Sequence, residues 1–155
     1  MGVVTTEIEH VSVVSPSKLF KAMVEDSDNV FPKAFTNYIK SVELIEGDGG
    51  PGSIKKVTLA EGYVKHKVDL VDEENYAYHY TVVEGSVLLE PLEKVSYEFK
   101  LVGNPDGGCI IKSMEKHYTK GDAQLSEEFL KTNKERSAWF IKVVEDYLLA
   151  NPDYN

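Results

Sequence analysis

Disulfides, membrane spans and a secretory leader are the features that this sequence lacks. Its 155 residues include one cysteine, Cys109, so no intramolecular disulfide can form and the fold must be stable with reduced thiols. No stretch approaches the roughly 18 consecutive apolar residues of a membrane span. No basic segment followed by an apolar run marks a signal peptide at the N-terminus. These absences predict a cytoplasmic protein, with the nucleus as a further compartment, and no membrane partner.

Positive charge is also scarce. The chain has 17 lysines and arginines against 26 acidic residues, and its formal net charge is −9. Because phosphate binding is driven largely by basic side chains, this balance argues against DNA as a partner. None of the histidines (His10, His66, His79 and His117) has metal-ligand spacing with another histidine, a cysteine or a carboxylate. We therefore expect no metal and no cofactor.

What is present is an ordinary globular composition, with 42% hydrophobic and 28% charged residues. The length is close to the commonest size of one domain. We therefore expect a single domain over residues 1–155, and a monomer. Cys109 has no nucleophile signature around it and is expected to be a small buried hydrophobe.

The order of local patterns is a strand, two short helices, a series of strands and one long helix. Ser15 and Pro16 predict the first helix start, residues 26–29 interrupt the helical spacing, and a second short helix is expected up to Pro32 and just beyond. Short β-type segments joined by tight turns favour an antiparallel meander and an α+β fold. The expected strands cover residues 3–13, 39–46, 53–59, 63–71, 76–83, 94–102 and 109–118.

A glycine-rich segment at 47–52 has the look of a phosphate-binding loop. Such a loop requires a helix to follow it, whereas the next residues here read as a strand. The segment is therefore predicted to be a rigid hairpin turn, whose glycines are Gly47, Gly49, Gly50 and Gly52.

The clearest alternation in the sequence places Tyr76, Tyr78, Tyr80 and Val82 on one face of a strand. A solid apolar core offers few partners for tyrosine hydroxyls. The face is therefore either a half-exposed tyrosine ladder or the wall of a cavity with polar tips. On the neighbouring strand His66 shares the parity of Val64 and is expected to point inward, as a pocket residue or a structural one. His79 is expected to face away.

The last helix is predicted from Ser126, its N-cap, to about Ala150. Asn133 and Ser137 interrupt its apolar stripe, and Arg136 lies at the margin. Polar groups on a buried stripe require partners or a wet cavity. Arg136 either pairs with Asp28, binds a ligand, or extends into water. The apolar positions of the stripe are Phe129, Leu130, Phe140, Ile141, Val144, Tyr147 and Leu148.

Several motifs resemble one plant family. They include Ser-Pro-Ser-Lys-Leu-Phe-Lys-Ala at 15–22, Val-Glu-Leu-Ile-Glu-Gly-Asp-Gly-Gly-Pro-Gly-Ser-Ile-Lys-Lys at 42–56, Tyr-Thr-Lys-Gly-Asp at 118–122 and Val-Glu-Asp-Tyr-Leu-Leu-Ala-Asn-Pro at 144–152. The chain thus resembles, over essentially its whole length, the class-10 pathogenesis-related proteins, the family of the major birch pollen allergen. The resemblance implies a seven-stranded curved antiparallel sheet wrapped around a long C-terminal helix, with two short helices and a large internal cavity.

Members of that family bind flavonoids, cytokinins, steroids and other amphiphiles. The resemblance implies that the chain is a defence-related binding or carrier protein for such small apolar or amphipathic metabolites. The turn at 61–63 is shorter than the family's, and Arg136 stands where an apolar residue is common. Carried over residue by residue, the ligand-binding positions are Met23, Asp28, Phe31, Ile39, Lys55, Leu59, Tyr63, His66, Lys67, Tyr78, Tyr80, Phe129, Asn133, Arg136 and Phe140.

Three other functions are alternatives to the carrier function. Relatives described as ribonucleases point to Lys55, Glu93, Glu145 and Tyr147, but these residues have evident structural roles and the acidic surface repels RNA. A norcoclaurine-synthase-like enzyme needs an inward glutamate beside an internal lysine, and the sequence shows no such glutamate. A hormone receptor of the abscisic-acid type needs gate and latch motifs that are absent from the sequence.

Overall fold

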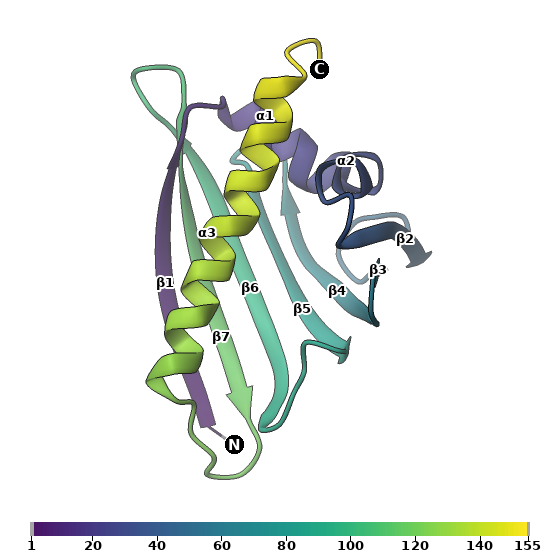
Figure 1. Cartoon of the computed structure of the whole chain (residues 1–155), viewed down its shortest axis with the longest axis vertical. Helices are drawn as coiled ribbons and strands as arrows, with labels where there is room; N and C mark the ends of the chain where they lie inside the picture. The colour runs from purple at the N-terminus through teal and green to yellow at the C-terminus, as the bar shows by residue number, and fades with distance from the viewer. Residues whose placement is uncertain (1, 155) are drawn as a thin grey trace.

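The computed structural model describes residues 2–154 and confirms the predicted α+β architecture (Figure 1). A strand, a short helix that continues into a π-helical stretch, and a second short helix are followed by six strands and a long C-terminal helix. The strands are β1 (Gly2–Ser12), β2 (Ile39–Glu46), β3 (Ile54–Leu59), β4 (Tyr63–Asp72), β5 (Ala77–Gly85), β6 (Leu92–Gly103) and β7 (Cys109–Thr119), and the helices are α1 (Pro16–Phe20), η1 (Lys21–Glu25), α2 (Ser27–Ala34) and α3 (Glu127–Ala150).

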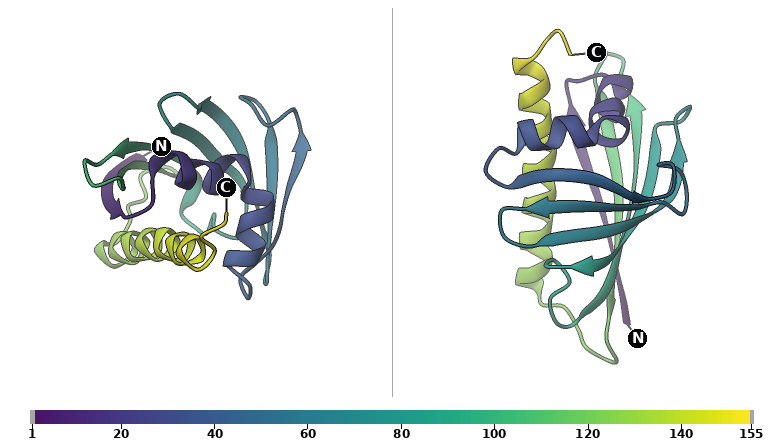
Figure 2. Two further views of the ribbon diagram at one scale, coloured as in Figure 1. Left: turned by 90° about the horizontal axis from the view of Figure 1, so that it is seen from above. Right: turned by 90° about the vertical axis from the view of Figure 1, so that its right-hand side faces the viewer.

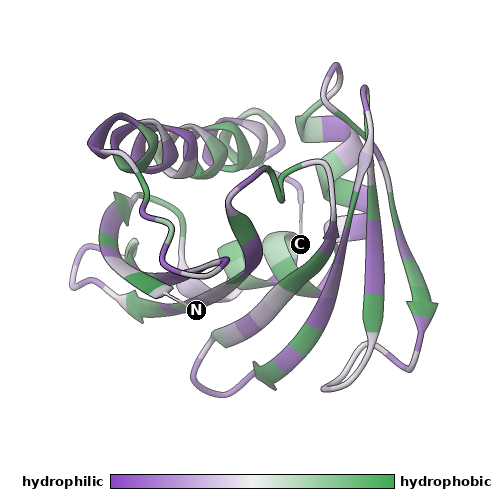
Figure 3. Ribbon diagram, turned by 90° about the horizontal axis from the view of Figure 1, so that it is seen from below, coloured by the Kyte–Doolittle hydropathy of each residue, from purple (hydrophilic) through white to green (hydrophobic). Residues whose placement is uncertain are grey.

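All seven strands form one antiparallel sheet in the order β1-β7-β6-β5-β4-β3-β2. The pairings of β2 with β3 and of β4 with β5 contain register shifts. Such bulges increase the local twist of a sheet. Seen from above in Figure 2, the sheet accordingly curls around one side of α3. Hydrophobic and hydrophilic residues alternate along the strands in Figure 3, as expected for a sheet with one solvated face.

Helix α3 lies across the concave face of the sheet (Figure 1). The Ser126 hydroxyl accepts a hydrogen bond of 3.0 Å from the Phe129 amide, and Glu127 and Glu128 occupy the first turn, where carboxylates suit the helix dipole. Its buried residues are Ile141, Val144 and Leu148, all in the C-terminal half. The N-terminal half contacts the sheet through half-buried side chains, among them Asn133, which donates a hydrogen bond to Glu115 of β7.

The short helices pack at the C-terminal end of α3. Helix α1 continues directly into a π-helical stretch, η1, and α2 follows after Asp26. The predicted interruption at residues 26–29 was too long, because helical hydrogen bonding resumes at Ser27 and buries Val30. Pro32 is inside α2, where residues up to Ala34 continue the helix.

The solid core lies between these short helices, the sheet and the C-terminal half of α3. Leu19, Phe20, Val30 and Val144 are almost completely buried there. Cys109 belongs to the same core, and burial raises the pKa of its thiol to about 11. The thiol is therefore kept protonated at neutral pH, as expected of a buried hydrophobe.

The glycine-rich segment is the hairpin turn between β2 and β3, as predicted. Gly47, Gly49 and Gly52 have positive φ angles of 88°, 100° and 92°. A side chain on Gly47 would collide with Ser53, whose hydroxyl accepts a hydrogen bond of 2.9 Å from the Gly49 amide. The turn thus requires glycine for backbone reasons, and no helix follows it to bind phosphate.

Candidate functional site

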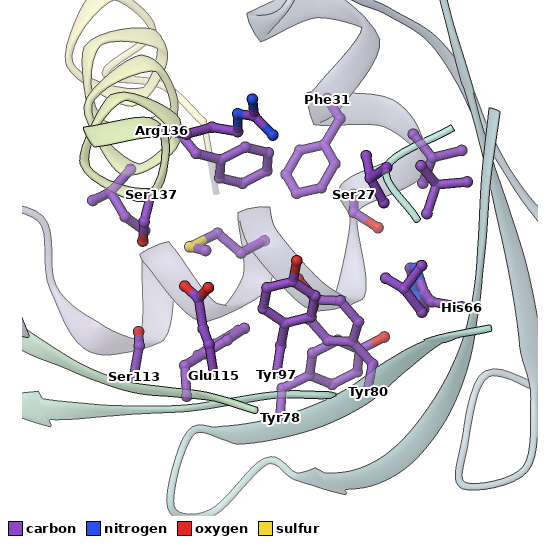
Figure 4. A pocket seen from close by; sticks show the side chains of 18 of the residues that line it. Ser27, Phe31, His66, Tyr78, Tyr80, Tyr97, Ser113, Glu115, Arg136 and Ser137 are labelled. Atoms are coloured by element: carbon purple, nitrogen blue, oxygen red, sulfur yellow. The ribbon is translucent and has the colours of Figure 1, made fainter. Parts of the chain in front are cut away.

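A cavity of about 260 Å³ lies between the sheet, α2 and the middle of α3, from Asn133 to Ile141. Most of its wall is apolar, with a few polar side chains at separate places. This composition is typical of small-molecule sites. Figure 4 shows side chains from α2, α3 and the sheet converging on the space.

Most of the predicted ligand-binding residues line this cavity. Lys55 and His66 do so from β3 and β4, and Arg136 does so from α3. Contact of any of them with a ligand stays a prediction. The predicted residues in the wall are Met23, Phe31, Ile39, Lys55, Leu59, His66, Tyr78, Tyr80, Asn133, Arg136 and Phe140.

Four predicted residues lie outside the wall. The Tyr63 hydroxyl bonds Glu84, and its ring lies 5.1 Å from the Lys56 ammonium. Lys67 is exposed, and on β4 it has the opposite parity to His66. Asp28 is an exposed residue of α2, and Phe129 packs edge-on against His117, with 5.6 Å between ring centroids. These four residues are thus not among those that line the cavity, and their contact with a ligand stays a prediction.

Tyrosines from two adjacent strands form one wall of the cavity. Tyr80 of β5 pairs across the sheet with Tyr97 of β6, and their rings stack with centroids 5.0 Å apart. The ring centroids of Tyr78 and Tyr80 are 5.5 Å apart. Burial raises the pKa of all three hydroxyls, so they remain neutral hydrogen-bonding groups. The face is therefore a cavity wall, and the exposed-ladder alternative is wrong.

Tyr76 does not belong to this wall, although the alternation placed it there. Its φ angle is +52°, which ends the strand geometry before Ala77. Its ring packs against Phe20 in the core instead, with 5.6 Å between centroids. Tyr97 is the wall residue that the sequence reasoning missed. The inward parity of Val95, Tyr97 and Phe99 along β6 could have identified it.

An aromatic cluster closes the cavity toward α2. Phe140 of α3 stacks on Phe35 at 4.7 Å and meets Phe31 edge-on at 5.3 Å. Trp139 contacts Phe35 and Tyr38 at 5.4 and 5.6 Å. Tyr38, Trp139 and Arg136 line both the cavity and an adjoining surface hollow. The hollow, which we call the mouth, therefore adjoins the cavity between α3 and the segment after α2.

Arg136 is exposed at this mouth. Within residues 2–154 its guanidinium forms no ion pair, so the predicted alternative of a salt bridge to Asp28 is wrong. Figure 4 shows its side chain extending from α3 above the aromatic rings. A cation at the mouth is thus available to an acidic group of a ligand.

One end of the cavity holds a lysine and a histidine. The Lys55 ammonium lies 5.7 Å from the Tyr78 ring, and burial lowers its pKa while the charge of Asp28 opposes that shift. Burial, and then the charge of Lys55, lower the pKa of His66 to about 4. Among residues 2–154 the Nε2 atom of His66 finds no hydrogen-bond partner. His66 is therefore a neutral, inward-facing group, whereas His79 faces out and lies 3.7 Å from Glu98.

The other end holds a carboxyl group that the sequence reasoning missed. Glu115 of β7 is 5% exposed, and Asn133 of α3 donates a 2.6 Å hydrogen bond to its Oε1 atom. Burial raises the pKa of Glu115, and the Asn133 bond opposes that shift. Ser113 and Ser137 face the same space from β7 and α3 (Figure 4). The expectation that no glutamate points inward was therefore wrong.

The residues of the ribonuclease alternative do not come together. Glu145 accepts a hydrogen bond from Ser12, which pairs with Cys109 at one end of β7. Glu93 follows Leu92, which pairs with Thr119 at the other end. The 11 residues of β7 span roughly 35 Å at about 3.3 Å per residue, so these two carboxylates cannot flank one phosphate. Lys55 lines the cavity and Tyr147 packs on the core.

Within residues 2–154, no group of three or more histidine, cysteine, aspartate or glutamate side chains is placed to hold a metal ion. No helix of that part of the chain combines the length and hydropathy needed to cross a membrane.

Comparison with solved structures shows the same fold in plant proteins of known structure. The crystal structure of Ara h 8.0201 superposes with a TM-score of 0.87 at 45% identity, covering 96% of this chain and 99% of that one. Norcoclaurine synthase from Thalictrum flavum superposes with a TM-score of 0.71 at 21% identity, covering 96% of this chain and 88% of that one. The second likeness is one of fold alone.

Sequence comparison finds relatives that match the chain from end to end. The chain is 51% identical to the major allergen Pru ar 1 of Prunus armeniaca and to the major allergen Mal d 1 of Malus domestica, with full coverage of both chains in each case. It is 50% identical to the major strawberry allergen Fra a 1.04 of Fragaria ananassa, covering 99% of this chain and 98% of that one. The model of the pathogenesis-related protein Bet v 1 family matches residues 1–151, and the chain belongs to this family.

Proposed function

We propose that the protein is a non-catalytic carrier that binds small amphipathic plant metabolites in its cavity. Cytokinins, flavonoids and steroids are the classes we propose, together with a defence-related role in the cytoplasm. The observation that carries the proposal is the cavity itself. It combines an aromatic and aliphatic wall with a neutral histidine, a carboxyl group and three tyrosine hydroxyls.

The arrangement of charges supports binding over catalysis. General acid–base chemistry needs two groups within reach of one reacting bond. The residues of the ribonuclease alternative are distributed over the cavity wall, the core and both ends of the sheet. The polar groups inside the cavity come from separate strands and serve better as contacts that orient a ligand.

The test measures saturable binding of the fluorescent probe 8-anilinonaphthalene-1-sulfonate and its displacement by a cytokinin or a flavonoid. A dissociation constant of about micromolar, or roughly 8 kcal/mol, is expected for a ligand of this size. Adjacent residues of β7 provide a matched pair of variants. Ser113 faces the cavity, whereas Lys112 is exposed on the other face.

Ser113→Phe should fill part of the cavity and reduce the affinity for the probe at least about tenfold, which corresponds to roughly 1.4 kcal/mol. Lys112→Phe should leave the affinity unchanged, because it adds the same ring outside the cavity. Near-ultraviolet circular dichroism checks that both variants are folded. Equal effects of the two variants, or no saturable binding by the wild type, would contradict the proposal.

A further inference from the structure

A row of three side chains crosses the concave face of the sheet beneath α3. Tyr80 on β5 pairs with Tyr97 on β6, and Tyr97 pairs with Glu115 on β7. Residues paired in this way project from the same face with neighbouring side chains. The row therefore places a carboxyl group directly beside two stacked aromatic rings, and all three residues line the cavity (Figure 4).

Only one of the two carboxyl oxygens of Glu115 accepts a hydrogen bond within residues 2–154. Asn133 donates to Oε1, and within residues 2–154 Oε2 has no hydrogen-bond donor and no lysine or arginine pairs with Glu115. The nearest basic group is the His117 imidazole, whose Nε2 lies 3.9 Å from Oε1. Burial lowers the pKa of His117, so this ring is neutral at neutral pH. Burial raises the pKa of Glu115, since a buried carboxylate is unfavourable until it is protonated or paired with a cation, and a cationic ligand would supply the pair.

We propose that Glu115, Tyr97 and Tyr80 form a subsite for a protonated amine carried by an aromatic ligand. The proposal rests on the proposed carrier function and adds the chemical class of the ligand. Oε2 of Glu115 accepts a hydrogen bond from the ammonium group, and the tyrosine faces attract its positive charge. The apolar wall receives the ligand's ring.

Within residues 2–154 neither Lys55 nor Arg136 forms an ion pair with Glu115, although the charge of Arg136 opposes the rise in the pKa of Tyr97 that burial causes. Lys55 is on β3 beside Tyr78, and Arg136 is exposed at the mouth. The imidazole of His10, on β1, lies 3.4 Å from the hydroxyl of Ser137, and burial lowers its pKa. Glu115 is therefore the local negative charge at this end of the cavity, and the amine is the group that complements it.

The experiment compares two ligands that differ in one group. Tryptamine carries an ammonium group where tryptophol carries a hydroxyl group, and both contain an indole ring. Their dissociation constants are measured by calorimetry at neutral pH for the wild type, Glu115→Gln and Glu7→Gln. Glu115→Gln keeps the shape and removes the charge. Glu7→Gln is the matched control, because Glu7 is exposed on neighbouring β1 and loses the same charge.

We expect the wild type and Glu7→Gln to bind tryptamine at least about tenfold more tightly than tryptophol, in the range of a hydrogen bond to a charged group. Glu115→Gln should lose this preference through weaker tryptamine binding, with tryptophol unchanged. Binding of the fluorescent probe and of tryptophol without any preference for tryptamine would overturn the subsite alone. Failure of all three to bind the wild type would overturn the carrier function as well.

Discussion

The imidazole of His66 lies against the ring of Tyr80, with 4.7 Å between their centroids, and its buried Nε2 atom has no hydrogen-bond partner in the described part of the chain, residues 2–154. Burial and the nearby charge of Lys55 both disfavour the imidazolium, which is why the pKa of His66 falls to about 4. In the unfolded chain the pKa returns to the ordinary 6.5. Between these values the unfolded state binds more protons than the folded state does.

His66 should therefore destabilise the protein in acid. The unfolding free energy that His66 takes away is small above pH 6.5. It grows as the pH falls toward 4, because protonation of His66 in the unfolded chain favours unfolding. From pH 7 to about pH 4.5 the wild type should lose about 2–3 kcal/mol more unfolding free energy than His66→Phe does, at about 1.4 kcal/mol per pKa unit. Urea unfolding of both proteins at the two pH values measures this difference.

The comparison with His66→Phe isolates this residue from other groups that titrate in the same range. Burial also lowers the pKa values of His10 and His117, whereas it raises the pKa of Glu115. These contributions are common to both proteins and cancel in the difference. Parallel pH profiles for wild type and variant would show that His66 is not held neutral by the fold.

The sequence predicted the elements well because the local signals were strong. Alternation fixed the strands to within a few residues, and Ser126 gave the start of α3. The same alternation also predicts which side chains face the cavity, and for two residues this prediction differs from the one implied by the family resemblance. Tyr63 and Lys67 have the opposite parity to His66 on β4 and therefore face out. Parity read strictly along each strand would have excluded both from the cavity.

Other features of the site depend on packing that no local pattern contains. Glu115 shares the parity of Ile111 on β7, but a buried glutamate is uncommon and its partner, Asn133, is on a different element. Tyr76 has strand-like neighbours, yet its positive φ angle turns it onto Phe20. Tertiary contacts decide where the side chains of Glu115 and Tyr76 lie, and the sequence alone does not predict these contacts.

Arg136 should select ligands by charge at the mouth of the cavity. Its side chain is exposed beside Trp139 and forms no ion pair within residues 2–154. Arg136→Met keeps the apolar stem and removes the charge. The affinity for an acidic aromatic ligand such as indole-3-acetate should fall by about 1–3 kcal/mol, the range for a lost hydrogen bond to a charged group. Calorimetry measures this change.

Two other ligands test whether the effect comes from charge. Tryptophol, which is neutral, should bind Arg136→Met and the wild type equally. Tryptamine should bind the variant as well as or better than the wild type, because a repulsive cation has been removed. A similar loss for the acidic and the neutral ligand would mean that Arg136 acts through packing at the mouth.

Glu145 should act in stability and not in cleavage of RNA. The hydroxyl of Ser12, which is buried at the end of β1, donates a 2.6 Å hydrogen bond to Oε2 of Glu145 on α3. Glu145→Ala removes this link and should lower the free energy of unfolding by about 1–3 kcal/mol, the range for a bond to a charged group. Glu145→Gln keeps an acceptor oxygen and should lose less. Urea unfolding distinguishes the two variants.

The same protein preparations test the ribonuclease alternative. Purified wild type, Glu145→Ala and the double variant Glu145→Ala, Lys55→Ala are compared for RNA cleavage at a temperature where all three are folded. Because Glu145 is tied to Ser12 and Lys55 faces the cavity, neither is placed with Glu93 around a common phosphate. We expect equal, background rates. Cleavage by the wild type that is tenfold or more above the double variant would refute the carrier assignment in favour of an enzyme.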